Sequence, residues 1–324
     1  MKSLLSVFLL ALTTSVAYGQ GLSNIPASHV DIGFGARPMA MGGAFVGLAD
    51  DEHSVYWNPA GLADTKNYIT SFSHADQMEF VTYRFMALAA PLPWDNLGAG
   101  ITIIESGDDM LREFSAQLGV GYRWKSIRAG LGMKYRHSGF GKNGFDDSDY
   151  IVFDPDEILN GRDQQVRGNG TGFGVDLGLL YRPNDRVGFG VVYRDVMNTF
   201  QWDSENASTS NPARGSYSEN LPSELILGSS FKAFRSTTVV ADYKPALSSD
   251  IDPMLRMGLE TGFMDVLFLR GGAEYRVNSF DDERYTAGVG LKTPSVAGLR
   301  LRLDYAYLID PLKPSQRISI AIQF

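Results

Sequence analysis

The chain ends in Arg317-Ile318-Ser319-Ile320-Ala321-Ile322-Gln323-Phe324. Successive side chains of an extended strand point to opposite faces, so the three isoleucines and the terminal aromatic share one face, and Arg317, Ser319 and Gln323 share the other. This alternation predicts a strand with one apolar and one polar face. A half-buried strand of a soluble sheet would show the same pattern. The rest of the sequence is needed to distinguish a strand of a membrane barrel from a strand of a soluble sheet.

The same alternation recurs from Lys66 to the end of the chain and predicts about fourteen strands. In one of them, Leu299, Leu301 and Leu303 alternate with Arg300 and Arg302. So many successive strands without helical periodicity between them favour a barrel or a large sandwich. The number is typical of single-chain outer-membrane barrels. The expected spans are 66–75, 79–91, 96–105, 111–124, 126–137, 170–182, 185–196, 222–234, 236–244, 253–263, 265–277, 284–293, 298–308 and 315–324.

An export signal decides for the barrel. Residues 1–19 combine Lys2, an apolar run and small residues before a cleavage site after Gly19, as a secretory signal peptide does. The chain contains no cysteine, which excludes disulfides, thiolate metal sites and a lipidated start. No later apolar run reaches the length of about twenty residues that a spanning helix requires. We therefore expect an all-β fold, a transmembrane outer-membrane β-barrel of antiparallel strands over residues 66–324, in a diderm bacterium.

The connections between the expected strands alternate in length. Those at 91–95 and 124–126 are short, whereas 138–169 and 197–221 are long and polar, and the long ones fall on one side. In outer-membrane barrels short turns face the periplasm and long loops face outside. An even number of strands then places both termini in the periplasm. We expect the terminal aromatic, Phe324, to be the assembly signal that the barrel-assembly machinery reads.

Residues 20–65 do not alternate. They are rich in small and apolar side chains, include Gly42 and Gly43, and contain Asn58-Pro59-Ala60. Glycine allows a backbone to pass through a confined space. One interpretation is a periplasmic arm. We favour a hatch that plugs the barrel lumen, because this segment is apolar enough to require burial.

Two stretches of this segment carry a resemblance to a known family. Gly-Ala-Arg-Pro-Met-Ala-Met-Gly-Gly-Ala-Phe at 35–45 and Ser-Val-Tyr-Trp-Asn-Pro-Ala-Gly-Leu-Ala at 54–63 resemble the N-terminal signature of the PorV/PorQ family, part of the FadL-like group of fatty-acid transport barrels. Asn58-Pro59-Ala60 matches the hatch motif of that group. The resemblance implies a fourteen-strand barrel plugged by an N-terminal hatch. It also implies one of two functions: passage of hydrophobic molecules through the barrel and a lateral gap, or reception of secreted proteins in type IX secretion.

Charged residues are expected on the inward face of many strands, and basic ones outnumber acidic ones there. Two interpretations stay open. These charges either pair with one another and with hatch carboxylates, or unpaired arginines attract an anion such as a fatty carboxylate. The candidate ligand or charge network consists of Arg84, Arg136, Arg194, Arg256, Glu260, Arg270, Glu274 and Arg302.

The sequence contains no catalytic constellation. Its 4 histidines are scattered, and none lies at metal-ligand spacing from another histidine. We therefore expect no metal, no cofactor and no enzymatic activity. The predicted function is passage of hydrophobic or amphipathic small molecules, and the alternative is a protein-binding component of type IX secretion. The expected partners are outer-membrane lipid, the barrel-assembly machinery and a hydrophobic small-molecule ligand, or type IX components under the alternative, and no nucleic acid.

Overall fold

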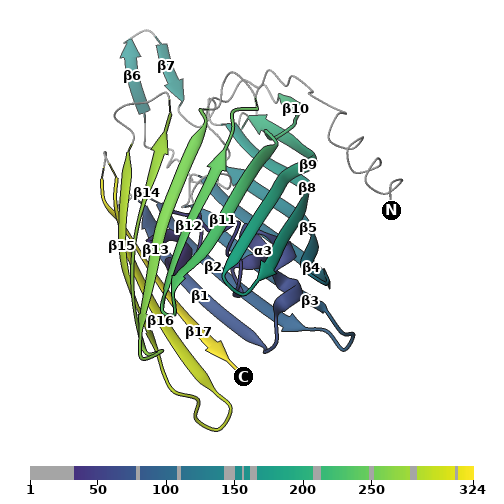
Figure 1. The fold of residues 1–324 in the computed structure, drawn as a ribbon. Helices are drawn as coiled ribbons and strands as arrows, with labels where there is room; N and C mark the ends of the chain where they lie inside the picture. The colour runs from purple at the N-terminus through teal and green to yellow at the C-terminus, as the bar shows by residue number, and fades with distance from the viewer. Residues whose placement is uncertain are drawn as a thin grey trace.

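A computed structural model describes residues 33–77, 81–107, 111–141, 150–154, 157–160, 166–206, 213–247, 252–277, 283–310 and 313–324. The predicted signal peptide lies outside these residues, as does the first part of the expected hatch. The described chain forms a closed antiparallel β-barrel of 14 strands (Figure 1). Among the described helices, none has the length and apolar character needed to cross a membrane.

Each of the fourteen predicted spans is confirmed as a strand, with shifted boundaries. Neighbouring strands pair in chain order around the ring, and β1 pairs with β17 to close it. The barrel strands are β1 (Ile69–Gln77), β2 (Val81–Pro91), β3 (Leu97–Gly107), β4 (Leu111–Trp124), β5 (Ile127–Phe140), β8 (Val166–Asn184), β9 (Val187–Asn206), β11 (Glu224–Phe234), β12 (Thr237–Lys244), β13 (Met254–Phe263), β14 (Leu267–Arg276), β15 (Arg284–Lys292), β16 (Arg300–Ile309) and β17 (Ser315–Gln323).

Parts of the predicted long connections are also strands. β8 and β9 extend into them, β9 pairs there with β10 (Arg214–Glu219), and β6 (Tyr150–Asp154) pairs with β7 (Glu157–Asn160). The end of β9 and most of β10 carry polar residues on both faces. Hydrophobic alternation therefore could not reveal them, because it reports only strands with one buried apolar face.

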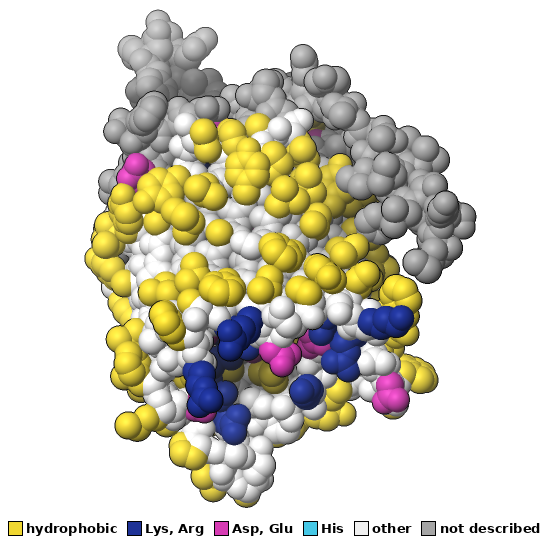
Figure 2. All heavy atoms as spheres, viewed as in Figure 1, with side chains coloured by type: hydrophobic (Ala, Val, Ile, Leu, Met, Phe, Trp, Pro, Cys, Tyr) yellow, Lys and Arg dark blue, Asp and Glu magenta, His cyan; other side chains and the backbone are white. Residues whose placement is uncertain are grey.

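The closing strand has the two faces that its sequence predicts. Ile318, Ile320 and Ile322 are 45%, 51% and 37% exposed on the outside of the barrel. Arg317, Ser319 and Ala321 face the lumen and are 2%, 1% and 3% exposed. Exposed apolar side chains form a broad zone over the outer surface (Figure 2). A band of this kind is what an outer-membrane barrel presents to lipid.

The chain terminus completes the seam between the first and last strands. Backbone hydrogen bonds of 3.0 Å run in both directions between Tyr68 and Phe324. Their rings stack with centroids 5.7 Å apart, and Phe324 remains half-exposed at the rim. This rim belongs to the end of the barrel with the tight turns, such as Lys125-Ser126 and Asp185-Arg186, here called the short-turn end (Figure 1). β6, β7 and β10 lie at the opposite end.

Candidate functional site: the hatch and its charged seat

The described part of the hatch, residues 33–64, fills the barrel lumen (Figure 1). It forms α2 (Ala36–Ala40), α3 (Ser54–Trp57) and the 3-10 helix η1 (Pro59–Asp64). Helix α2 contacts β14 to β17, and η1 contacts β2 to β5 and β8. All of these residues are buried except Asp50 and Asp64. The segment therefore contacts the inner face of the barrel wall along two arcs, β14 to β17 and β2 to β5 with β8.

One side of the hatch is aromatic and packs on β2. Phe34 stacks on Phe85 with ring centroids 5.3 Å apart, and the Trp57 indole N–H donates to the Phe34 carbonyl at 3.0 Å. The placement of Arg84 in the lumen is wrong, because Tyr83 and Phe85 occupy the inward positions there. Arg84 points outward, and its side chain is 58% exposed. Val81 to Pro91 is apolar at nearly every position, so alternation alone could not assign its faces.

Gly42 and Gly43 turn the chain against the wall. Both have positive φ values, 67° and 74°, which glycine adopts without steric cost. The Gly42 N–H donates a hydrogen bond of 3.0 Å to Oγ1 of Thr286 in the barrel wall. A Cβ on Gly42 would lie only 2.7 Å from the carbonyl oxygens of Met257 and Ala273. No residue other than glycine fits where the hatch backbone comes this close to the wall backbone.

Asn58 joins the hatch to itself and to the wall. Its Nδ2 donates to the Val46 carbonyl at 3.0 Å and to the Leu179 carbonyl of β8 at 3.2 Å. Its Oδ1 accepts from the Ala60 N–H at 3.1 Å and caps η1. Pro59 begins η1, where the missing proline N–H leaves no hydrogen bond unmade. The Asn-Pro-Ala triplet thus acts as one structural unit.

The other side of the hatch is charged, and Arg37 is its centre. Arg37 donates from Nε and Nη2 to the two oxygens of Glu260 on β13, each at 2.9 Å. Its Nη1 also reaches Asp50 at 2.6 Å and Asp51 at 2.8 Å. Glu260 receives a second arginine, because Arg270 Nε lies 2.6 Å from it. Bidentate arginine–carboxylate pairs are strong and directional.

These contacts continue into a chain of alternating charge that leaves the hatch and returns to it. Arg270 contacts Asp304 at 2.7 Å, and Arg302 contacts Asp304 at 2.8 Å and Glu52 of the hatch at 2.6 Å. Each buried charge has an opposite neighbour, which offsets the cost of its desolvation. We call this set the charged seat; its members are Arg37, Glu260, Arg270, Asp304, Arg302 and Glu52.

Asp51, Glu52 and His53 place ligand-type atoms within 4.8 Å of one another, the spacing of a metal site. Guanidinium groups already occupy both carboxylates, at Arg37 and Arg302. Burial favours the neutral imidazole, but Asp51 and Glu52 outweigh burial and raise the pKa of His53 above its ordinary value. Because both carboxylates are already paired with guanidinium groups, this donor set fits an ion-pair cluster.

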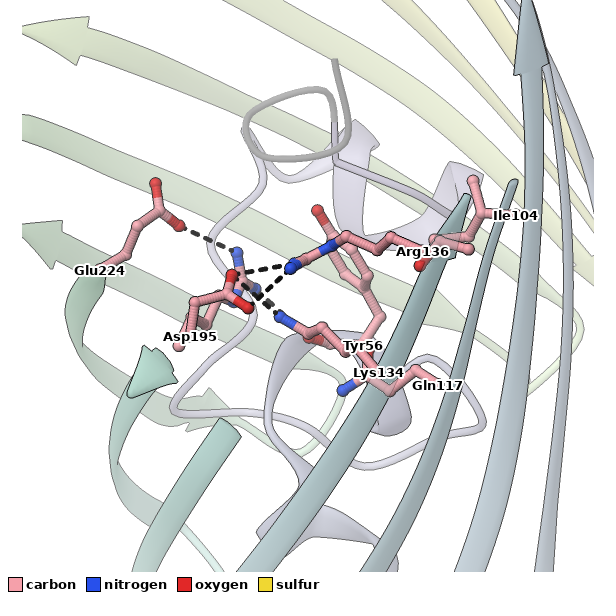
Figure 3. Close-up of a pocket in the computed structure, with 9 residues that line it drawn as sticks. Tyr56, Ile104, Gln117, Lys134, Arg136, Asp195 and Glu224 are labelled. Carbon is pink, nitrogen blue, oxygen red and sulfur yellow. Dashed lines mark hydrogen bonds and ion pairs between the residues drawn. The ribbon is translucent and has the colours of Figure 1, made fainter. Parts of the chain in front are cut away.

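A second group of charges lies across the lumen (Figure 3). Lys134 reaches Asp176 at 2.7 Å, Arg136 reaches Asp195 at 2.9 Å, and the Arg194 guanidinium lies 4.9 Å from the centre of the Tyr56 ring. Of these residues, all but Asp176 line a cavity of about 20 Å³. That volume suits about one water molecule, whereas small-molecule pockets measure about 300–1,000 Å³. This cavity is therefore too small for a hydrophobic ligand.

The structure brings the other predicted charges into such pairs, including Arg256 with Glu274 at 2.7 Å. The interpretation in which lumen charges neutralise one another accounts for all seven: Arg136, Arg194, Arg256, Glu260, Arg270, Glu274 and Arg302. Sequence reasoning missed Arg37. A signal was present, because Arg37 is the single Lys or Arg between residues 33 and 65 and lies in an apolar stretch.

Comparison with known families and structures gives two results. The family model described as type IX secretion system membrane protein PorP/SprF matches residues 55–313. Among solved structures, the Pseudomonas aeruginosa FadL homologue superposes with a TM-score of 0.59 at 12% identity, covering 89% of this chain and 97% of that one. The Pseudomonas putida toluene transporter TodX superposes with a TM-score of 0.58 at 14% identity, covering 90% of this chain and 97% of that one. The Ralstonia pickettii toluene transporter TbuX superposes with a TM-score of 0.57 at 14% identity, covering 90% of this chain and 98% of that one. No functionally curated protein sequence matches.

Proposed function

Because the chain belongs to the type IX secretion system membrane protein family PorP/SprF, we propose that it serves this system as a protein-binding outer-membrane partner. In this proposal its lumen is not a route for cargo or small molecules, and it has no enzymatic activity. The observation that supports the proposal is the hatch, which is packed against the wall on one side and held by the charged seat on the other.

The energetics favour a hatch that stays in place. Opening the lumen would separate Arg37 from Glu260 and Arg302 from Glu52. Removing one partner from a buried ion pair costs about 3–5 kcal/mol when the other stays buried. Opening would also expose Phe34 and Trp57 to water, and burying one such aromatic side chain contributes about 1.5–3 kcal/mol. A conduit through the whole length of the lumen would need these contacts to break in every transport cycle.

A second candidate is the passage of hydrophobic molecules. The observation that favours it is the fold shared with two toluene transporters and a FadL homologue. This candidate requires a hatch that rearranges, or a gap in the barrel wall. The PorV/PorQ resemblance of residues 33–63 stays a prediction beside the PorP/SprF membership, and it would give the protein-binding role a finer form, the reception of secreted proteins.

Cargo delivery and lumen closure test the proposal together. In a type IX secreting host, we expect deletion of the gene to remove most of a reporter with a type IX C-terminal domain from the cell surface. In planar bilayers we expect the intact protein to stay nearly closed. A variant lacking residues 21–62 should insert and conduct ions, because nothing then fills the lumen.

Two results would reject the proposal. The first is normal reporter delivery in the deletion strain. The second is uptake of a hydrophobic solute, such as toluene, into liposomes by the intact protein, which would favour the second candidate. Equal conductance of the intact and shortened proteins would show that the hatch does not close the barrel.

A further inference from the structure

Basic side chains gather around the short-turn end of the barrel. Figure 2 shows Lys and Arg side chains below the apolar zone, with few acidic ones among them. Asp50 and Asp64 of the hatch are incompletely buried, and the acidic residues Asp95, Asp185 and Asp265 lie in the turns at this end. We call the basic set the cationic mouth; it consists of Arg123, Arg128, Arg182, Arg186, Lys232, Lys292 and Arg300.

These cations belong to the lumen side of the wall and not to the lipid side. Arg123, Arg128 and Arg182 all contact Asp64 of the hatch, at 3.2, 2.9 and 2.5 Å. Lys232 shares the face of Ser230, whose hydroxyl donates to a hatch carbonyl at 2.9 Å. Lipid headgroups surround the outside of a barrel, so lumen-facing charges are poorly placed to bind them. Their ligand must come from the aqueous opening.

Arg300 and Lys292 lie on the far side of the mouth. Arg300 shares the inward face of Arg302, and Lys292 is the direct cross-strand neighbour of Arg302. The other members of the cationic mouth lie on or beside β4, β5, β8, β9 and β11, which are contiguous in the ring. Going around the ring, β16 is seven strands from β8 in either direction. Cations therefore face one another across the opening.

Four members of the cationic mouth have no ion-pair partner within the described part of the chain: Arg186, Lys232, Lys292 and Arg300. They also lie beside like charges. The Lys232 N–H donates to the Arg186 carbonyl at 2.8 Å, which places these two basic residues side by side. Lys292 is opposite Arg302, and like charges directly opposite on neighbouring strands are destabilising. An anion bound at the mouth would remove this repulsion.

Asp64 shows which chemistry the mouth binds. One carboxylate draws three guanidinium groups from β4, β5 and β8 onto itself. Arg182 also donates to the Leu48 carbonyl, so it is held in place before any ligand arrives. On the β15–β16 side, Asp265 of the β13–β14 turn acts on Lys292 without forming an ion pair within 4 Å, and Arg300 has no carboxylate partner among the described residues. A second carboxylate there would complete the arrangement.

We propose that the cationic mouth is a docking site for an acidic segment of a partner polypeptide, which enters from the short-turn side and places carboxylates between Lys292, Arg300 and the opposite arc. The inference rests on the proposed function, because it names the chemistry of the partner that such a role requires. In the expected topology this partner lies in the periplasm.

Binding of a simple acidic peptide tests the site in isolation. The probe is a fluorescein-labelled oligo-glutamate, with oligo-glutamine as the uncharged control, measured by anisotropy against the detergent-purified full chain. We expect saturable oligo-glutamate binding that weakens between about 0.05 and 0.5 M NaCl, since salt screens exposed charges. Lys292→Gln/Arg300→Gln should bind about fivefold more weakly, because it loses two partly exposed ion pairs.

The matched control is Arg84→Gln/Arg214→Gln, which removes the same charge from exposed positions on β2 and β10, away from the mouth. It should bind as the wild type does. Equal weakening by both double variants would show nonspecific attraction and overturn the proposal. So would equal binding of oligo-glutamine, or binding of anionic phosphatidylglycerol vesicles in place of the peptide.

Crosslinking in the native host identifies the partner segment. A photoreactive residue at position 300 is compared with one at position 214, and the captured peptides are sequenced by mass spectrometry. A captured segment rich in Asp and Glu at position 300 alone supports the site, and a neutral or basic segment overturns it. Peptide binding does not depend on secretion. Binding without a secretion defect in the deletion strain would therefore reject the proposed function and keep the site, and a secretion defect without binding would do the reverse.

Discussion

Glu260 is the wall residue whose neutralisation should release the hatch. The change Glu260→Gln keeps the shape but leaves the Arg37 guanidinium without its bidentate partner on β13. Breaking a buried pair costs about 3–5 kcal/mol. Asp50 and Asp51 still face Arg37, and Asp304 still faces Arg270, so we take the lower value. The cost falls on the seated state, because Arg37 regains water when the hatch leaves.

A loss of about 3 kcal/mol lowers the equilibrium constant for hatch seating roughly 100-fold. The chain has no cysteine, so a single buried thiol can report that equilibrium. Ser54→Cys is a suitable reporter, because Ser54 is fully buried in α3 and its hydroxyl has no hydrogen-bond partner in the structure. Its reaction with a water-soluble maleimide requires local opening, so the labelling rate scales with the open population.

We expect Glu260→Gln to raise the Ser54→Cys labelling rate roughly 100-fold. The control in the same background is Glu105→Gln, which removes a carboxylate from an exposed pair, 3.4 Å from Arg84. Exposed pairs contribute about 0–1 kcal/mol, so this change should alter the rate less than about fivefold. Similar rates in the two variants would refute the view that the charged seat holds the hatch.

Three further outcomes are expected. Tags inserted near positions 160 and 210 should label on intact cells, and labelling only after permeabilisation would reverse the topology. Phe324→Ser should lower outer-membrane levels with little loss of stability in the folded barrel, because the side chain is half-exposed; normal levels would reject its role as the assembly signal. The raised pKa of His53 means that its ion pairs stabilise most below the ordinary value of 6.5 and are lost as pH rises through the raised value. The excess thermal stability of the wild type over His53→Gln should therefore shrink at alkaline pH, and a constant difference would contradict a charged ring.

The transmembrane strands could be predicted because lipid and lumen impose opposite demands on alternate positions. In β17 and the first part of β16 this demand is clear, because inward Arg302, Asp304, Arg317 and Ser319 alternate with outward apolar residues, whereas Ala306 and Leu308 face the hatch at the end of β16. In β2 it is not, because the hatch presents Phe34 to that wall and makes both faces apolar. The error at Arg84 therefore came from the contents of the lumen, about which a strand's own sequence carries no information.

Which charges meet could not be predicted in the same way. Arg256 with Glu274 and Glu260 with Arg270 are direct neighbours across β13 and β14, so these pairs follow from strand register. Register depends on turn geometry as well as on alternation. The contact between Arg37 and Glu260 joins residues 223 positions apart. No local sequence pattern encodes such a pair, because the two residues meet only when the hatch packs inside the barrel.

The seam between β1 and β17 also bears on how the protein enters the membrane without making it leak. The Ala36 N–H donates to Ser319 on the last strand at 2.8 Å, across 283 positions of sequence. Ser73 of the first strand shares that hydroxyl at 2.6 Å. The place that receives α2 is therefore incomplete until the final strand arrives. We therefore expect ring closure and hatch seating to be coupled, so that biogenesis avoids a stage in which a finished, empty pore lies open across the bilayer.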